Sequence, residues 1–176
     1  MNNFLIRGVR LLGVLIVLTA LTSVTLPPQK AVASHETYKV GDRTPTGGTV
    51  FYVLPLDTIS SWHYLEVAPD NWNSGKLANT SYNRAERYVY AYEDKSWYIP
   101  SSDEFATLYS ENRAKRLKSI TLKSGIYWTS TGVVINKQIQ SLQAFNTSTR
   151  KLTARSYKSA INGKVLLRVR PIRSFD

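Results

Sequence analysis

The chain contains no cysteine among its 176 residues, and this absence most constrains how it can fold. Without disulfides or thiolate metal sites, packing and hydrogen bonds alone must hold the domain together. One domain of this length can bury a substantial core. Four Trp and eleven Tyr supply large apolar surfaces for it. The missing thiols also exclude cysteine nucleophiles and redox chemistry, and two histidines are too few for a typical zinc site.

The first residues have the layout of a secretory signal peptide. Arg7 and Arg10 precede an apolar run from Leu11 to Leu26, and Ala31-Val32-Ala33 follows as a small-x-small cleavage pattern. The apolar run is short for a membrane-spanning helix. We therefore expect secretion or display at the cell surface; the alternative is an uncleaved segment that anchors the chain in the membrane. The expected organisation is a signal peptide over 1–33, a mature lead over 34–40 and a single domain over 41–176.

The charges of the chain are strongly polarised along the sequence. From Asn112 to Phe175 there are fourteen Lys and Arg but no Asp or Glu, whereas Ser34 to Glu111 carries eleven acidic and six basic residues. Such an asymmetry indicates an anionic partner. We expect an anionic polysaccharide, a cell-wall polymer or a surface protein; export argues against nucleic acid as the main partner. The alternative is that the two parts neutralise each other in the fold.

Local patterns predict two helices. Ser101 and Glu104 after Pro100 form the sequence signature of a capping box, and Phe105, Leu108 and Tyr109 follow at helical spacing, so a helix should run to about Asn112. The segment from Tyr82 to Asp94 is ambiguous, because its alanines and charges favour a helix while its tyrosines alternate as in a strand. We favour a helix there.

Apolar and β-branched runs predict the strands. They cover residues 49–54, 62–67, 126–130, 141–147 and 164–172. The strands and the helix face together predict a core, which we expect to contain Val50, Tyr52, Leu65, Val67, Phe105, Leu108, Trp128, Phe145, Leu167 and Val169. The predicted class is α+β, with two helices packed on a mainly antiparallel, irregular sheet.

Several segments resemble a known family in the order in which the family has them. They are Gly41-Asp42 with Gly47 to Val53, Tyr64 to Pro69, Trp97 to Phe105, Tyr127 to Thr131, Gln143 to Phe145 and Val169 to Phe175. Together they span most of Val40 to Phe175 and resemble bacterial secreted domains of the Lcl C-terminal type. The resemblance implies a C-type-lectin-like fold and a binding habit, without naming a ligand.

The expected function is non-catalytic ligand binding, with no cofactor, no metal and no catalytic residue. Loops on a rigid scaffold are where binding residues concentrate. We expect one positive surface on the loops between the last strands, with Trp72 as an exposed stacking platform in a polar loop. The candidate ligand-binding residues are Trp72, Lys137, Arg150, Lys151, Arg155, Tyr157 and Lys158.

Alternatives remain open at this point. Asp70-Asn71-Trp72-Asn73 offers oxygen ligands for calcium. Glu66, Asp103 and Glu104 could supply a carboxylate pair for an extracellular hydrolase of cell-envelope material. A membrane-anchored structural or adhesion module is the third alternative. At least one of Arg170 and Arg173 is expected in a structural ion pair, with Glu66 or Glu104 as partner.

Overall fold

The structure is a computed structural model that describes residues 37–55, 57–72, 79–91 and 96–176. The predicted signal peptide lies outside the described residues. The chain after residue 35 forms one body of six strands and three helices within the described ranges. In the same ranges no helix is long and apolar enough to cross a bilayer.

The first sheet joins the two ends of the domain. It has the order β1-β2-β6 and is antiparallel, with β1 at Thr49–Val53, β2 at Tyr64–Val67 and β6 at Ile172–Phe175. Tyr64 pairs with Phe175 and Val67 with Ile172. The strand predicted over 49–54 is confirmed, and the one predicted over 62–67 begins two residues later.

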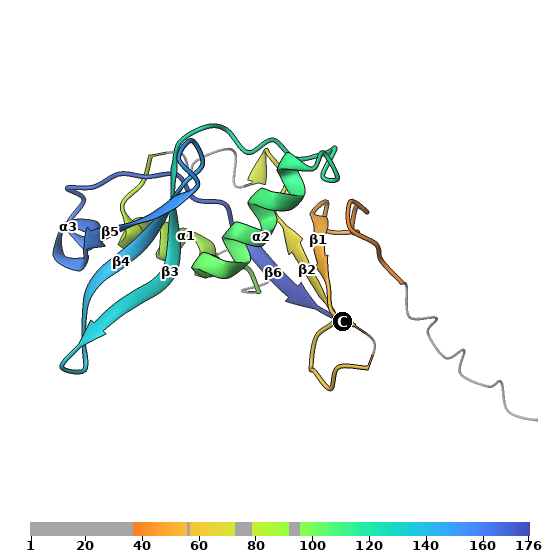
Figure 1. Cartoon of the computed structure of the whole chain (residues 1–176), viewed down its shortest axis with the longest axis horizontal. Helices are drawn as coiled ribbons and strands as arrows, with labels where there is room; N and C mark the ends of the chain where they lie inside the picture. The colour runs from red at the N-terminus through yellow and green to blue at the C-terminus, as the bar shows by residue number, and fades with distance from the viewer. Residues whose placement is uncertain (1–36, 56, 73–78, 92–95) are drawn as a thin grey trace, which may run out of the picture. The chain divides into compact units, whose positions relative to one another are not determined.

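The second sheet is also antiparallel and has the order β3-β4-β5. Its strands are β3 at Ile126–Ile135, β4 at Gln138–Asn146 and β5 at Lys151–Ser156. Asn136 and Lys137 form the β3–β4 turn, both with positive φ (51° and 63°), as the tight turns that suit twisted hairpins require. The β3–β4 hairpin and the β4–β5 turn lie at opposite ends of β4 (Figure 1).

The strand predicted over 164–172 is wrong. The backbone of this segment bonds to three separate partners: Leu167 pairs with Thr80, Arg168 with β3, and Pro171 accepts from Ala68 at 3.0 Å. The alternation of apolar and basic side chains in this segment therefore reflects which residues are buried along an extended connection. It does not indicate a strand paired with a single neighbouring strand. Only β6, at its end, joins a sheet.

Three helices cover the sheets. α1 spans Tyr82–Tyr90, as favoured from the sequence, α2 spans Ser102–Arg113, and the short α3 spans Tyr157–Ile161. The capping box of α2 is confirmed: Ser101 Oγ accepts from Glu104 N at 3.2 Å, and Glu104 Oε2 accepts from Ser101 N at 2.7 Å. α3 was not predicted.

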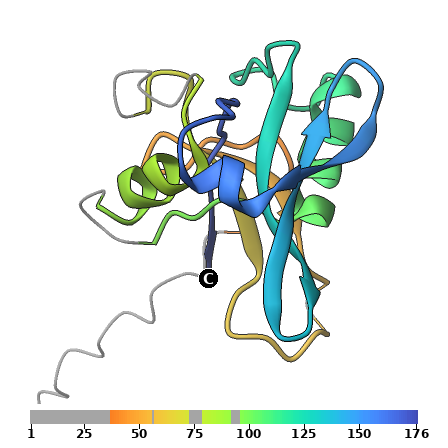
Figure 2. The ribbon, with the colours of Figure 1, turned by 90° about the vertical axis from the view of Figure 1, so that its left-hand side faces the viewer.

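Helices α1 and α2 lie on opposite sides of the second sheet (Figure 2). The α2 side contains Phe51, Leu65, Val67, Phe105, Leu108, Leu117, Ile120, Tyr127, Phe145 and Ile172. The α1 and α3 side contains Ala68, Trp72, Tyr82, Ala85, Val89, Trp97, Ile99, Trp128, Leu142, Ala144, Ala160 and Val169. Among the described residues, the buried members of both clusters lie within residues 51–172.

Eight of the ten residues predicted for the core are buried, and Tyr52 and Leu167 are half-buried. The α+β class with antiparallel strands is confirmed. The expectation of two helices on one sheet is corrected to three helices with two three-stranded sheets in the described ranges.

Candidate anion-binding site

The predicted basic surface is divided between the two ends of β4. Lys137 lies at the β3–β4 turn before β4 begins, whereas Arg150 and Lys151 follow β4 at the other end. A strand of nine residues spans about 30 Å, so these side chains cannot share one small ligand. The predicted residues therefore form two groups, because a long strand that the sequence does not reveal separates the two loops, and their sharing of one ligand surface stays a prediction.

The remaining candidates lie with Lys137, away from the Arg150 turn. Ser156, at the end of β5, pairs with Ser141 near the start of β4, and Arg155, Tyr157 and Lys158 flank it. Arg155 and Tyr157 are half-buried, and Lys137, Arg150, Lys151 and Lys158 are exposed. Within the described ranges none of these basic residues forms an ion pair, so the predicted acidic partners do not neutralise them.

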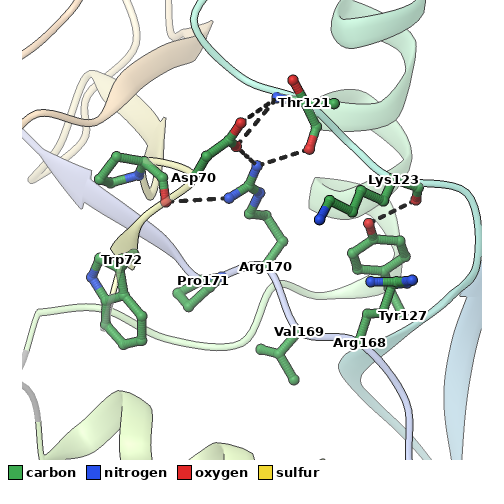
Figure 3. Close-up of a pocket in the computed structure, with 10 residues that line it drawn as sticks. Asp70, Trp72, Thr121, Lys123, Tyr127, Arg168, Val169, Arg170 and Pro171 are labelled. Carbon is green, nitrogen blue, oxygen red and sulfur yellow. Dashed lines mark hydrogen bonds and ion pairs between the residues drawn. The ribbon is translucent and has the colours of Figure 1, made fainter. Parts of the chain in front are cut away.

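A pocket of about 250 Å³ with a mixed polar and apolar lining lies between the end of β2, the start of β3 and the segment that leads into β6. Its lining includes Asp70, Lys123, Tyr127, Arg168 and Arg170 (Figure 3). We call it the Arg170 pocket. Its size suits one sugar ring or one small anionic group, since pockets for larger ligands start at about 300 Å³.

Arg170 forms the rigid wall of this pocket. Its guanidinium pairs with the Asp70 carboxylate and donates to Thr121 O at 3.1 Å and Pro69 O at 3.3 Å. The Asp70 carboxylate also accepts from Thr121 N at 3.2 Å. Only 11% of the Arg170 side chain is exposed, so these contacts fix its position and tie three segments of the chain together.

Arg168 is held in the pocket by its backbone. Arg168 O accepts from Trp128 N at 2.9 Å, and Arg168 N donates to Ile126 O at 3.0 Å, so the residue runs beside β3. Its side chain lies directly over Gly125, where an added Cβ would be 2.8 Å from Arg168 Nε. The side chain has no hydrogen bond or ion pair within the described chain.

Tyr127 and Lys123 complete the lining. The Tyr127 hydroxyl donates to Lys123 O at 2.8 Å, which holds the Lys123 backbone at the rim while its exposed side chain extends toward Arg170 (Figure 3). Burial raises the pKa of Tyr127, an effect that the nearby Arg170 and Arg168 charges oppose. The phenol therefore stays neutral and remains a hydrogen-bond donor at physiological pH.

The charges around the pocket do not balance. Asp70 offsets Arg170, while Arg168 and Lys123 have no acidic partner in the described part of the chain. Two basic side chains thus face the same small space without compensation. Such an arrangement attracts an anion, because two positive charges lie at one small pocket and a bound anion can accept charge-assisted hydrogen bonds from both.

The β4–β5 turn adjoins this pocket. Ser124 Oγ and Ser148 Oγ lie 2.9 Å apart, and Thr147 N donates to Gly125 O at 3.0 Å. These bonds join the loop that carries Lys123 to the turn that carries Arg150 and Lys151. Two of the predicted binding residues are therefore connected through this turn to the loop that supplies Lys123 to the pocket.

Trp72 lines the Arg170 pocket but is not an exposed platform. Its side chain is buried, with 7% of the residue exposed, and its ring packs 6.1 Å from that of Trp97. The prediction of exposure is wrong, because the short segment after β2 folds back over the core; Trp72 N donates to Pro69 O at 3.0 Å. Its role in ligand binding remains a prediction.

Arg173 has a structural role, as expected from the sequence. It pairs with Glu66 at 2.5 Å, and Glu66 is completely buried. Glu66 also accepts hydrogen bonds from Thr44 and Thr46 of the loop before β1. Gly48 is needed in this loop, because an added Cβ would overlap Glu66 Oε2.

The carboxylates considered for other functions are engaged in contacts of the fold, with the exception of Asp103, which is exposed. Glu104 accepts from Tyr98 Oη at 2.9 Å and caps α2. Asp70, considered for calcium, holds Arg170, while Asn73 lies outside the described residues. No group of three or more His, Cys, Asp or Glu side chains is placed to hold a metal ion in the ranges that the structure describes.

Sequence reasoning missed Lys123 and Arg168 as site residues. Lys123 lies in a stretch rich in serine and threonine and belongs to no recognisable motif. Arg168 falls on the polar side of the strand predicted there. Their meeting depends on the pairing of Arg168 with β3, which no local pattern encodes. The chain matches no protein-family model and no curated protein.

Proposed function

We propose that this chain is an exported, non-catalytic binding domain that captures an anionic group of a glycan or cell-wall polymer in the Arg170 pocket. The observation that carries the proposal is the pair of uncompensated side chains, Arg168 and Lys123, in a pocket fixed by Arg170. The ordered motifs that resemble the Lcl C-terminal type also support a C-type-lectin-like fold, and the signal-peptide layout supports export.

The flanking turn extends the proposed contact. A polymer with repeated carboxylates or phosphates would place one group in the pocket and a neighbouring group against Arg150 and Lys151. Exposed charges more than about 8 Å apart are largely screened at physiological salt, so the turn acts by adding short-range contacts. Binding should therefore weaken with salt while retaining a component from the partly buried pocket.

The test is a titration of residues 34–176 with a polyuronate and a polyphosphate, each against a neutral glucan as control, at two salt concentrations. The variant Lys123→Gln with Arg168→Gln should weaken binding by at least about tenfold, as expected for the loss of charge-assisted hydrogen bonds. The matched control is Lys158→Gln with Lys164→Gln, which removes the same charge near α3.

The control separates pocket binding from attraction to net charge. If both double variants weaken binding equally, the affinity comes from overall charge and the pocket is not the site. If the control weakens it more, the ligand binds beside α3. If the wild-type chain binds none of the anionic polymers at either salt concentration, the proposed function fails.

A further inference from the structure

The far half of β3 is an open sheet edge. Up to Ser130 its outer side is covered, because Trp128 N donates to Arg168 O at 2.9 Å and Ser130 N to Pro100 O at 2.8 Å. From Gly132 to Ile135 the pairing of β3 within the described chain is with β4 alone, on its inner side. We call Gly132–Ile135 the β3 free edge, where no described segment supplies an outer partner strand.

This edge lacks two of the features that usually prevent strands from pairing, charge and proline. Natural edge strands carry charged residues, proline or strong irregularities that discourage a second chain. β3 contains no charged residue and no proline over its ten residues, and its one irregularity along the free edge is a register shift against β4 between Val133 and Val134. Along the free edge, Val134 is 60% exposed and Ile135 is 54% exposed, and Ile139 of β4 is 43% exposed beside them. Exposed aliphatic side chains on an unpaired strand favour strand addition.

The two ends of the edge carry opposite charges. At the turn, Lys137 is exposed and has no ion pair within the described ranges. At the other end, Thr131 Oγ1 accepts from Ser102 N at 2.9 Å, which places the first turn of α2 beside the edge. The next residue, Asp103, is exposed and likewise has no ion pair there.

We propose that the β3 free edge pairs with the same edge of a second copy of this chain, in an antiparallel, two-fold arrangement. With the axis between Val133 and Val134, Ile135 of one copy lies opposite Gly132 of the other. Lys137 then lies just beyond the paired residues, toward Asp103 in the first turn of α2 of the second copy, and the symmetric contact repeats at the other end. The edge is self-complementary in charge, as a two-fold interface requires.

A bilayer fits this surface less well than a protein edge. The tip of the hairpin is Asn136-Lys137-Gln138, which is polar and charged, so the part that would enter a membrane first is the least apolar. The pairing surface is also small. It buries less than the roughly 1,200 Å² of a typical stable interface, so the dimer is weak and the fraction of chains in the dimer rises with concentration.

The test is sedimentation of residues 34–176 over a concentration series from about 10 μM to about 1 mM, which covers the range of weak association. The wild-type chain should show a monomer–dimer equilibrium. Val134→Lys places a charge on the edge and should leave only monomer; since Val134 is largely exposed, the fold should tolerate it, which the thermal midpoint checks.

Charge reversal tests the two-fold arrangement itself. Lys137→Asp and Asp103→Lys should each weaken dimerisation by about tenfold, and the double reversal should restore it, because the pair is then complementary again. Lys158→Asp is the matched control, since it makes the same charge change away from the edge and should leave dimerisation unchanged.

Three results would overturn the proposal. They are a wild-type chain that stays monomeric throughout the series, a Val134→Lys variant that dimerises normally, and a double reversal that fails to restore association. Co-sedimentation with phosphatidylglycerol vesicles is measured in parallel. Vesicle binding that depends on Val134 while the chain remains monomeric would assign the edge to a bilayer instead. None of these readouts depends on binding in the Arg170 pocket.

Discussion

Arg173 lies 2.5 Å from the completely buried carboxylate of Glu66, and this ion pair joins β2 to β6 beneath the loop before β1. The Arg173 guanidinium also lies 5.3 Å from the centre of the Trp97 ring, in cation–π geometry. The pair thus connects both ends of the domain. A buried carboxylate without its partner is costly, so the ion pair is a sensitive point for stability.

We predict that Arg173→Met destabilises the domain by about 3–5 kcal/mol, because Glu66 would remain buried and lose its cationic partner. Chemical unfolding of residues 34–176 measures the change. Arg116→Met is the control, because Arg116 pairs with Glu111 at the surface, and the unfolding midpoint should hardly move. Replacing Glu66 with Leu as well should recover part of the loss; an Arg173→Met variant as stable as wild type would contradict the assignment.

We predict that Phe105→Ala costs about 3–5 kcal/mol, because it leaves a cavity between α2 and the second sheet. The Phe105 ring lies 4.9 Å from that of Tyr127 and 5.2 Å from that of Phe145, and the residue is completely buried. Leu152→Ala is the control, since Leu152 is 44% exposed and should matter little. Thermal unfolding of both variants provides the comparison, and equal midpoints would show that α2 does not pack on this sheet.

The contrast between α2 and β5 shows what the sequence could predict. The start of α2 depends on Ser101 and Glu104, three residues apart, so local chemistry determines it. β5 has no such signal. Its half-buried positions are Thr153 and Arg155 while Leu152 is exposed, so its pattern does not resemble a strand with an apolar face. β5 forms because β4 offers a partner.

The same reasoning applies to the candidate site. Asp70 and Arg170 are one hundred residues apart, and Thr121 lies between them in sequence, so their contacts arise only in the folded chain. Charge polarity predicted that binding would involve the basic end of the chain. The charge pattern could not show that one end of β4 leads to the turn connected with Arg168 and Lys123. Nor could it show that the other end of β4 lies beside the β3 free edge.

We predict that stability falls between about pH 10 and pH 12, and that Tyr82 contributes to the fall. Burial, together with the Glu86 charge, raises the pKa of Tyr82 to about 12. An unfolded tyrosine ionises near pH 10, whereas the buried phenol keeps its proton. The contribution is therefore fully present below about pH 10 and is lost as the pH rises through the folded pKa.

Thermal midpoints across this pH range test the prediction. Tyr82→Phe keeps the ring without the ionisable group, so its midpoint should fall less steeply than that of wild type. Tyr52→Phe is the matched control, because it makes the same change in β1, at a residue that is not among the charges acting on Tyr82. Identical slopes for wild type and Tyr82→Phe would show that Tyr82 ionises as easily in the folded state as in the unfolded one.

We predict that Gly125→Ala weakens anion binding by displacing the Arg168 side chain. Gly125 has a φ of 151°, which favours glycine, and an added Cβ would lie 2.8 Å from Arg168 Nε. The guanidinium must move from its place over Gly125, and we expect about a tenfold loss of affinity, comparable to one charge-assisted hydrogen bond. Titration with the polyuronate or polyphosphate that wild type binds gives the measurement.

Two variants separate this effect from strain in the backbone. Gly163→Ala is the control, because Gly163 also has a positive φ, of 74°, but an added Cβ meets nothing within 4 Å. It should lower stability without changing affinity. In an Arg168→Gln background, Gly125→Ala should cause little further loss of binding, since both changes remove the same contact. Losses that add fully in the double variant would mean that Gly125 shapes the pocket by some route other than Arg168.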